Sequence, residues 1–211
     1  MQDIVIVGAG GFGREVQWLI ERINNIDNLW NIRGYIDDSV SIGCEVNGYK
    51  VLGGVEYLKD VKHELAVVCA IGNSLIRKKV VDKIINNSNI SFPNLIDPSV
   101  NMSDRINMGK GNIICSGNIL TVNIEIKDFN IINLDCTVGH DVKIDSYVTI
   151  YPSANISGNV NVGHNVEIGT GSHIIQGLNI GSNSIIGAGT VVIRDVEMGR
   201  TVVGNPARVV K

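Results

Sequence analysis

The histidines have the clearest capacity for acid–base chemistry in this chain. Two of them follow the same Val-Gly dipeptide, His140 before Asp141 and His164 before Asn165. Histidine is the natural general base near neutral pH. Asp141 can carry a negative charge beside the imidazole and fix its tautomer, whereas Asn165 cannot supply charge. The sequence therefore predicts His140 as the base and His164 as a solvated histidine.

Two further histidines and four cysteines are weaker candidates. His63 is predicted to lie in a loop, and His173 should point outward from a strand. No two cysteines form a C-x-x-C pair, and none sits at a plausible nucleophile position, so reduced thiols in a cytosolic protein are expected. The cysteines are Cys44, Cys69, Cys115 and Cys136.

A glycine-rich turn near the N-terminus could hold a phosphate. A buried strand from Ile4 to Val7 runs into the G-x-G-x-x-G motif of residues 8–13, and a helical apolar pattern follows. Glycines at such a turn let a phosphate approach the backbone and the helix N-terminus. Asp37 and Asp38 end the next strand and are placed to accept hydrogen bonds from a ribose or base. A tight turn without ligand and a solvated Asp38 remain the alternatives.

The rest of the N-terminal part continues this alternation of strands and helices. An apolar strand, Leu65–Ile71, leads through Gly72-Asn73 into a helix over Ser74–Ile85, and a last strand is predicted over Ile90–Ile96. Arg77 lies one turn into that helix and could reach a phosphate, although it also fits a solvated face. The pattern predicts a half-sized Rossmann-like domain over residues 1–96, which favours a nucleotide sugar over NAD.

Beyond this domain, Ile, Leu, Val or Met recurs at every sixth residue. A six-residue period is typical of a parallel β-helix, in which three hexapeptides form one coil. We predict this β-helix over residues 97–211, with the boundary near residues 96–98. The ladder consists of Met102, Met108, Ile114, Leu120, Ile126, Ile132, Val138, Ile144, Ile150, Ile156, Val162, Ile168, Ile174, Ile180, Ile186, Val192 and Met198.

A second column, two residues before the ladder, should point inward near a corner. It holds small or β-branched residues over most of its length, from Val142 to Val196. The glycines that often follow the ladder are expected to supply turn dihedrals closed to other residues. His140 and His164 share one offset in the repeat and are expected at equivalent corners. No long insertion covers the prism, so a neighbouring subunit is expected to wall any site on it.

Composition and charge exclude several classes of function. The net charge of −3 gives no reason to bind nucleic acid or an anionic membrane. No apolar run approaches the ~20 residues of a membrane span. The N-terminus lacks the basic start of a signal peptide. A cytoplasmic protein is therefore expected.

The ladder, with its Gly204-Asn205-Pro206-Ala207-Arg208 ending, resembles the left-handed β-helix acyltransferases of the hexapeptide family. The glycine-rich turn, Tyr35-Ile36-Asp37-Asp38 and Ala70-Ile71-Gly72-Asn73 narrow the resemblance to the NeuD/PglD-type sugar acyltransferases. It covers essentially the full chain. It implies an α/β plus all-β homotrimer, with a small Rossmann-like N-terminal domain followed by a left-handed parallel β-helix.

The resemblance also implies an activity and its residues. The activity is acetyl transfer from acetyl-CoA to the amino group of a nucleotide-linked amino sugar, of the UDP-4-amino-sugar type, in bacterial glycan biosynthesis. His140, Asp141 and the Gly158 backbone N–H fall on catalytic positions. The nucleotide sugar is expected at Gly10, Gly11, Phe12, Asp37, Asp38, Gly72, Asn73 and Arg77. CoA is expected at Thr149, Gly158, Thr170, Gly187, Ala188, Gly204, Asn205, Pro206 and Arg208.

Two positions depart from the family. Thr149 stands where PglD-type members carry a second His, and Asp141 stands where PglD has Glu. A contact through the missing imidazole is therefore in question, and the shorter acid has less reach.

Other activities stay open. O-acetylation of sialic acid or another sugar would use the same base and CoA cleft. A metalloenzyme similar to γ-class carbonic anhydrase would need zinc ligands at His140, His164 and His173, but their spacing does not fit and no metal is expected. A non-catalytic nucleotide-sugar-binding protein is a further alternative. The half-sized nucleotide domain disfavours a dehydrogenase.

Overall fold

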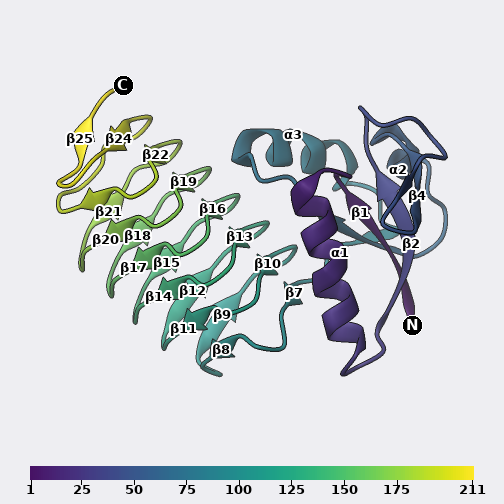
Figure 1. Ribbon diagram of the computed structural model, residues 1–211, viewed down its shortest axis with the longest axis horizontal. Helices are drawn as coiled ribbons and strands as arrows, with labels where there is room; N and C mark the ends of the chain where they lie inside the picture. The colour runs from purple at the N-terminus through teal and green to yellow at the C-terminus, as the bar shows by residue number, and fades with distance from the viewer. The chain divides into compact units, whose positions relative to one another are not determined.

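The computed structural model describes residues 1–211, which form two compact units, Met1–Pro98 and Ser99–Lys211 (Figure 1). The first unit is an α/β sheet with helices, and the second is a parallel β-helix, as predicted. The longest helix has 14 residues. None of the helices combines the length and apolarity needed to cross a bilayer.

The first unit contains a six-stranded sheet in the order β3-β4-β2-β1-β5-β6. The strand order reverses between β1 and β5, both of which are buried and parallel. Ligands of α/β sheets bind beyond the carboxyl ends of the strands at this point. The elements are β1 (Gln2–Val7), α1 (Gly11–Asn24), β2 (Trp30–Ile36), β3 (Glu45–Val46), β4 (Tyr49–Gly53), α2 (Glu56–Lys59), β5 (Leu65–Cys69), α3 (Ser74–Ile84), β6 (Ile90–Ser91) and β7 (Leu95–Ile96).

Two local features of this unit differ from the sequence predictions. The strand predicted over Ile90–Ile96 is broken into β6 and β7, because Pro93 lies between them and has no N–H to donate. The β3–β4 hairpin was not predicted. Its turn residues Asn47 and Gly48 have φ of 46° and 85°, as an Asn-Gly hairpin turn requires.

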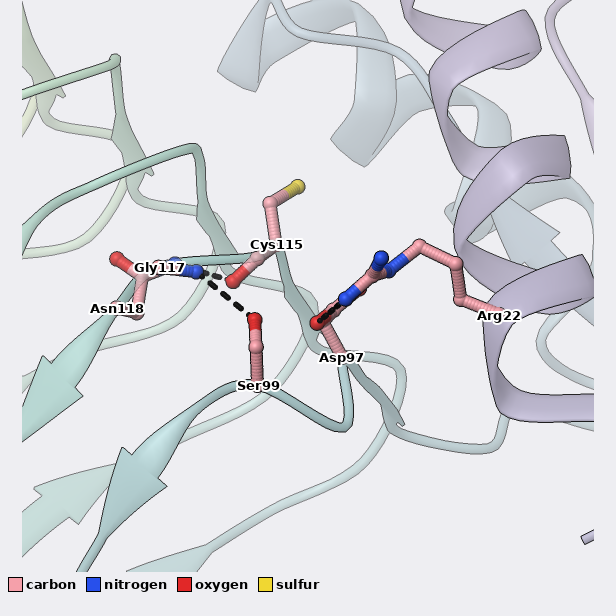
Figure 2. A network of polar contacts seen from close by, with 6 residues as sticks. All are labelled: Arg22, Asp97, Ser99, Cys115, Gly117 and Asn118. Atoms are coloured by element: carbon pink, nitrogen blue, oxygen red, sulfur yellow. Dashed lines mark hydrogen bonds and ion pairs between the residues drawn. The ribbon is translucent and has the colours of Figure 1, made fainter. Parts of the chain in front are cut away.

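An ion pair ties the end of the first unit to its own helix α1. Arg22 donates from Nε and Nη2 to the two carboxylate oxygens of Asp97, at 2.6 and 3.0 Å (Figure 2). The Asp97 side chain is 1% exposed, so removing Arg22 alone would leave a buried carboxylate without its main partner. This pair raises the pKa of Arg22, chiefly through the hydrogen bond.

The second unit is built from coils of three short strands. Each strand pairs in parallel with the strand one coil further on, and partners lie 18 residues apart, as Asn130 and Asn112 do. The strands are β8 (Asn101–Met102), β9 (Ile106–Met108), β10 (Ile113–Ile114), β11 (Ile119–Leu120), β12 (Ile124–Ile126), β13 (Ile131–Ile132), β14 (Thr137–Val138), β15 (Lys143–Ile144), β16 (Thr149–Ile150), β17 (Asn155–Ile156), β18 (Asn161–Val162), β19 (Glu167–Ile168), β20 (His173–Ile174), β21 (Asn179–Ile180), β22 (Ile185–Ile186), β23 (Val191–Val192), β24 (Thr201–Val203) and β25 (Arg208–Val209).

These strands form the three faces of a prism (Figure 1). One face runs from β10 through β13, β16, β19 and β22 to β24 and β25; we call it the first face. The second face contains β8, β11, β14, β17, β20 and β23, and the third contains β9, β12, β15, β18 and β21. The first coils are held by side chains as well as strands. Ser99 Oγ accepts from Gly117 N, and Asn118 donates to the Cys115 carbonyl (Figure 2). Asn118 Oδ1 also accepts from Cys136 N in the next coil.

The corners are formed by residues in the left-handed region, three positions before each ladder residue. Many are Asn or Asp, such as Asn123 (φ 57°), Asp141 (φ 59°) and Asn183 (φ 60°). The others are Gly, or the residues Phe129, Tyr147 and Ser153. The glycines after the ladder were predicted to serve this purpose, and that prediction was wrong for all of them except Gly199 (φ 73°). Gly139 and Gly169 have no positive φ; a Cβ on either would lie 2.6 Å from a backbone nitrogen of the next coil. Their role is close packing between coils.

The ladder is confirmed from Ile114 to Val192, where every member is buried. Its predicted last member is wrong, because Met198 is 69% exposed. After Val192 the coil shortens from 18 to 16 residues, so that Thr201 pairs with Ile185 and Val202 with Ile186. Val196 therefore takes the inward position that the simple period gave to Met198, and Val202 takes the inward position of the following strand.

This register change predicts unequal effects of two substitutions. Ile168→Ala should lower the free energy of unfolding by about 2–5 kcal/mol, because Ile168 is fully buried. Met198→Ala should change it by less than about 0.5 kcal/mol, as expected for an exposed side chain. Chemical denaturation of both variants measures the difference. A loss at Met198 as large as that at Ile168 would contradict the shortened coil.

Candidate active site

The His140–Asp141 pair lies on the edge of the prism between the second and third faces. His140 follows β14, and the left-handed conformation of Asp141 turns its carboxylate back toward the preceding side chain. The imidazole Nδ1 lies 2.8 Å from Asp141 Oδ2. The hydrogen bond from His140, and then one from Asn123, lowers the pKa of Asp141. A charged carboxylate therefore holds Nδ1, and Nε2 is the ring nitrogen left to accept a proton.

Gly158 lies one coil beyond His140 on the same edge. A Cβ at residue 158 would overlap the His140 ring, so only glycine leaves room for the imidazole in this position. The Gly158 carbonyl accepts a hydrogen bond from Gly177 N, but the Gly158 N–H makes no hydrogen bond within the chain. The structure thus places the His140 ring against Gly158, whose N–H is unused within the chain.

His164 lies on a different edge, between the third and first faces. The two histidines are 24 residues apart in number, which is one coil and one further hexapeptide, so the expectation of equivalent corners was wrong. Asn165 Nδ2 donates to Asn183 Oδ1 at 3.1 Å, toward the next coil. His164 therefore has no charged neighbour in the position that Asp141 takes beside His140.

The predicted CoA residues mark a third edge, between the first and second faces. Thr170 and Ala188 follow β19 and β22 and occupy the same corner in successive coils, where both are exposed. Gly204 follows β24 on the next coil, and Gly204 N donates to Thr190 Oγ1 (3.2 Å). Gly187 packs against Val203, leaving no room for a Cβ.

The remaining CoA candidates divide into two buried and several exposed residues. Thr149 is 1% exposed, and Gly158 is buried beside the His140 ring. Asn205, Pro206 and Arg208 are exposed in the final hairpin, where β24 pairs with β25 in the antiparallel direction. The hairpin thus adds exposed residues after the coil that follows Ala188.

In the first unit, the four glycines of the turn divide into two kinds. A Cβ on Gly13 would overlap the carbonyl oxygen of Gly8, and a Cβ on Gly8 (φ 104°) would lie 2.9 Å from the Ala70 oxygen. These two glycines are required by the fold. A Cβ on Gly10 would meet nothing within 4 Å, and one on Gly11 only the end of Arg14 at 4.0 Å. Gly10 and Gly11 therefore leave open backbone at the N-terminus of α1, beside the half-buried Phe12.

The acidic pair is hydrogen-bonded to the protein's own backbone. Asp37 Oδ2 accepts from Ala9 N (2.8 Å), and Oδ1 accepts from the amide and hydroxyl of Ser39. Burial alone would raise the pKa of Asp37, but these hydrogen bonds outweigh it and lower the pKa. Asp38 Oδ1 accepts from Val55 N at 2.8 Å. Both carboxylates thus shape the loops around the glycine turn.

The side chains of Arg77 and Asn73 also form hydrogen bonds with nearby backbone groups. Arg77 was predicted to reach a phosphate from an exposed position, but it is 1% exposed and donates from Nη1 to the carbonyls of Ile71 and Gly72. Asn73 is the N-cap of α3 and accepts from Ile76 N at 2.9 Å. The structure gives both side chains a part in fixing the loop after β5, at the reversal point of the sheet.

Two further observations complete the site. No group of three or more His, Cys, Asp or Glu side chains is arranged to hold a metal ion. Asn123 was not predicted; it contacts Asp141 from the preceding coil, with Nδ2 3.2 Å from Oδ1. The sequence signal was available, because Asn123 stands 18 residues before Asp141 and one coil spans 18 residues.

The hydrogen bonds of Asp37 predict a pH-dependent loss in Asp37→Asn. Because the folded pKa lies below the ordinary value of 3.8, the stabilisation is complete at neutral pH and is lost as pH falls through the folded pKa. The variant should lose about 1 kcal/mol of unfolding free energy at pH 7. Its difference from wild type should shrink below about pH 4. Denaturation across pH, with Asp27→Asn as a control at an exposed carboxylate, tests this; a constant difference would contradict it.

Comparison with known proteins relates both units to one family. Residues 3–84 match the PglD N-terminal domain family. The chain is 35% identical over 158 residues to GDP-perosamine N-acetyltransferase of Escherichia coli O157:H7, covering 72% of this chain and 69% of that protein.

Two solved structures are similar to this protein over essentially its full length. The acetyltransferase domain of PglB from Neisseria gonorrhoeae FA1090 is 30% identical with a TM-score of 0.92 and 100% coverage of both chains. PerB from Caulobacter crescentus, solved with CoA and GDP-perosamine, is 27% identical with a TM-score of 0.89, covering 99% of this chain and 97% of that chain. The chain therefore belongs to the PglD-type family of sugar acyltransferases.

Proposed function

We propose that this protein transfers the acetyl group of acetyl-CoA to the amino group of a nucleotide-linked amino sugar. The observation that carries the proposal is the hydrogen-bonded His140–Asp141 pair beside the unused N–H of Gly158. The open glycine turn of the first unit supports the nucleotide part of the substrate. The similar proteins of E. coli and C. crescentus are named for, or were solved with, GDP-perosamine.

The proposed reaction is direct transfer in a ternary complex. The sugar amine, as free base, attacks the thioester carbonyl, and Nε2 of His140 takes the proton that the amine loses. The Gly158 N–H stabilises the oxyanion, which collapses as the C–S bond breaks and CoA leaves as a thiolate that receives a proton. Asp141 holds the imidazole by Nδ1 and balances the charge that the ring acquires.

The cysteines support direct transfer over an acyl-enzyme. Burial raises the pKa of Cys69 to about 12 and that of Cys136 to about 11, so neither forms the nucleophilic thiolate near neutral pH. Cys115 is also buried. None of these three buried thiols is therefore suited to accept the acetyl group.

We further propose that the active site is shared between copies of the chain in a homotrimer. The His140 edge and the edge of Thr170 and Ala188 are opposite margins of the second face. A base on one margin and CoA contacts on the other meet most simply when the edges come from two chains. No long loop interrupts the coils to cover the site from within one chain.

The nucleotide and the pathway are finer parts of the proposal. The sequence resemblance favours a UDP-linked 4-amino sugar, whereas the relatives point to GDP. Both substrates, like acetyl-CoA, fit a cytoplasmic step of bacterial glycan biosynthesis. The class of acceptor is tested by following thiol release and product mass with acetyl-CoA and a panel of UDP- and GDP-linked amino sugars and free sialic acids. Acetylation of sialic acid alone would establish the O-acetyltransferase alternative. If no acceptor in the panel causes release of the CoA thiol, the proposal is refuted.

The base assignment predicts unequal effects at the two histidines. His140→Ala should lower kcat by about 10²–10⁴-fold, the usual contribution of a general base. His164→Ala, on another edge, should keep near wild-type kcat and is the matched control. Steady-state kinetics and circular dichroism of both variants make the comparison. Near-full turnover of a folded His140→Ala protein would rule the base out.

The shared site predicts complementation between two inactive variants. His140→Ala lacks the base, and Ala188→Trp should block the CoA edge that the substituted chain itself contributes. Co-expression should restore activity, since about a quarter of the sites in an equal mixture would combine two intact edges. A mixture as inactive as each variant alone would show that each chain forms its own site.

A further inference from the structure

The carboxylate side chain of Asp141 is about half exposed on the edge of the prism. It is 46% exposed, and that of His140 is 48% exposed. An exposed carboxylate can rotate about its side-chain bonds and leave the imidazole. The orientation of the pair therefore depends on what else binds Asp141.

The coil register supplies that second contact. Asn123 occupies the same corner one coil earlier, also in the left-handed region, with φ of 57° against 59° for Asp141. Its Nδ2 lies 3.2 Å from Asp141 Oδ1, while His140 Nδ1 lies 2.8 Å from Oδ2. The two donors use different oxygens, so they do not compete. Together they fix the plane of the carboxylate.

We propose that Asn123 is a positioning residue that acts on His140 through Asp141. The amide of Asn123 holds the carboxylate in the plane where Oδ2 receives Nδ1–H. This hydrogen bond keeps the proton of the neutral imidazole on Nδ1 and leaves Nε2 as the acceptor beside Gly158. Without Asn123, the carboxylate spends part of its time turned away, and the imidazole is free to carry its proton on Nε2, where it cannot act as a base. The inference rests on the proposed function for its effect on catalysis, but not for its effect on the tautomer.

The corner conformation provides clean substitutions for the test. Glycine accepts a left-handed corner without strain, so Asn123→Gly removes the amide and keeps the backbone. Asn123→Asp keeps the size but places a carboxylate against Asp141. The matched control is Asn183→Gly, since Asn183 has φ of 60° and also makes a corner-to-corner contact, accepting from Asn165 at 3.1 Å.

The experiment combines kinetics with nitrogen-15 NMR of the His140 ring in the full-length protein. Asn123→Gly should lower kcat about threefold to tenfold, the scale of one hydrogen bond, with the KM for acetyl-CoA unchanged. Its His140 spectrum at a pH where the ring is neutral should shift from the Nδ1–H toward the Nε2–H tautomer. Asn123→Asp should lower kcat further, and Asn183→Gly should alter neither kcat nor the tautomer.

The tautomer separates this inference from the proposed activity. A wild-type His140 tautomer in Asn123→Gly overturns the positioning role, whatever the kinetics. An equal loss of kcat in Asn183→Gly overturns it too, because the loss would then follow from the corner and not from the contact with Asp141. If the tautomer shifts but wild-type protein acetylates no sugar in the panel, the positioning role stands and the proposed function fails.

Discussion

The parallel pairing of each strand with the strand 18 residues further on is the constraint on which the second unit depends. It requires a buried aliphatic residue at each inward position and a left-handed corner three residues before it. It also fixes which residues become neighbours. His140 lies against Gly158, and Asp141 against Asn123, because each pair is one coil apart. The chemistry of the site is therefore set by backbone hydrogen bonds made elsewhere in the coils.

The corner conformation explains how a hydrogen-bonded histidine–carboxylate pair can arise in such a repeat. Asn and Asp are favoured among non-glycine residues in the left-handed region, so an acid at a corner satisfies the backbone first. At Asp141 the same geometry turns the carboxylate toward the side chain that precedes it. The equivalent residue after His164 is Asn165, which binds across to the next coil instead. The difference between Asp141 and Asn165, at equivalent positions of the repeat, therefore decides whether the preceding histidine has a carboxylate or an amide beside it.

The sequence predicts this fold well because its strongest signal, the six-residue period, reports directly which side chains point inward. The same signal does not state the edge on which a corner lies. That depends on position within 18 residues, which is why His140 and His164 looked equivalent and are not. The period also does not reveal that one coil is two residues shorter than the others. Met198 keeps the six-residue spacing, but its side chain is exposed. In the first unit, residue type alone could not show that Asp37 and Arg77 bind the protein's own backbone.

These backbone contacts also determine which groups of the glycine turn in the first unit stay open to a ligand. Gly8 and Gly13 allow the turn to pack, and Asp37 holds the amide of Ala9. The groups available to a ligand are therefore those that make no close contact within the fold, chiefly the open backbone of Gly10 and Gly11. Backbone donors bind a phosphate without reading the base attached to it. If the proposed substrate binds here, this turn would therefore hold its phosphate, and the choice between nucleotides would come from the loops around the turn.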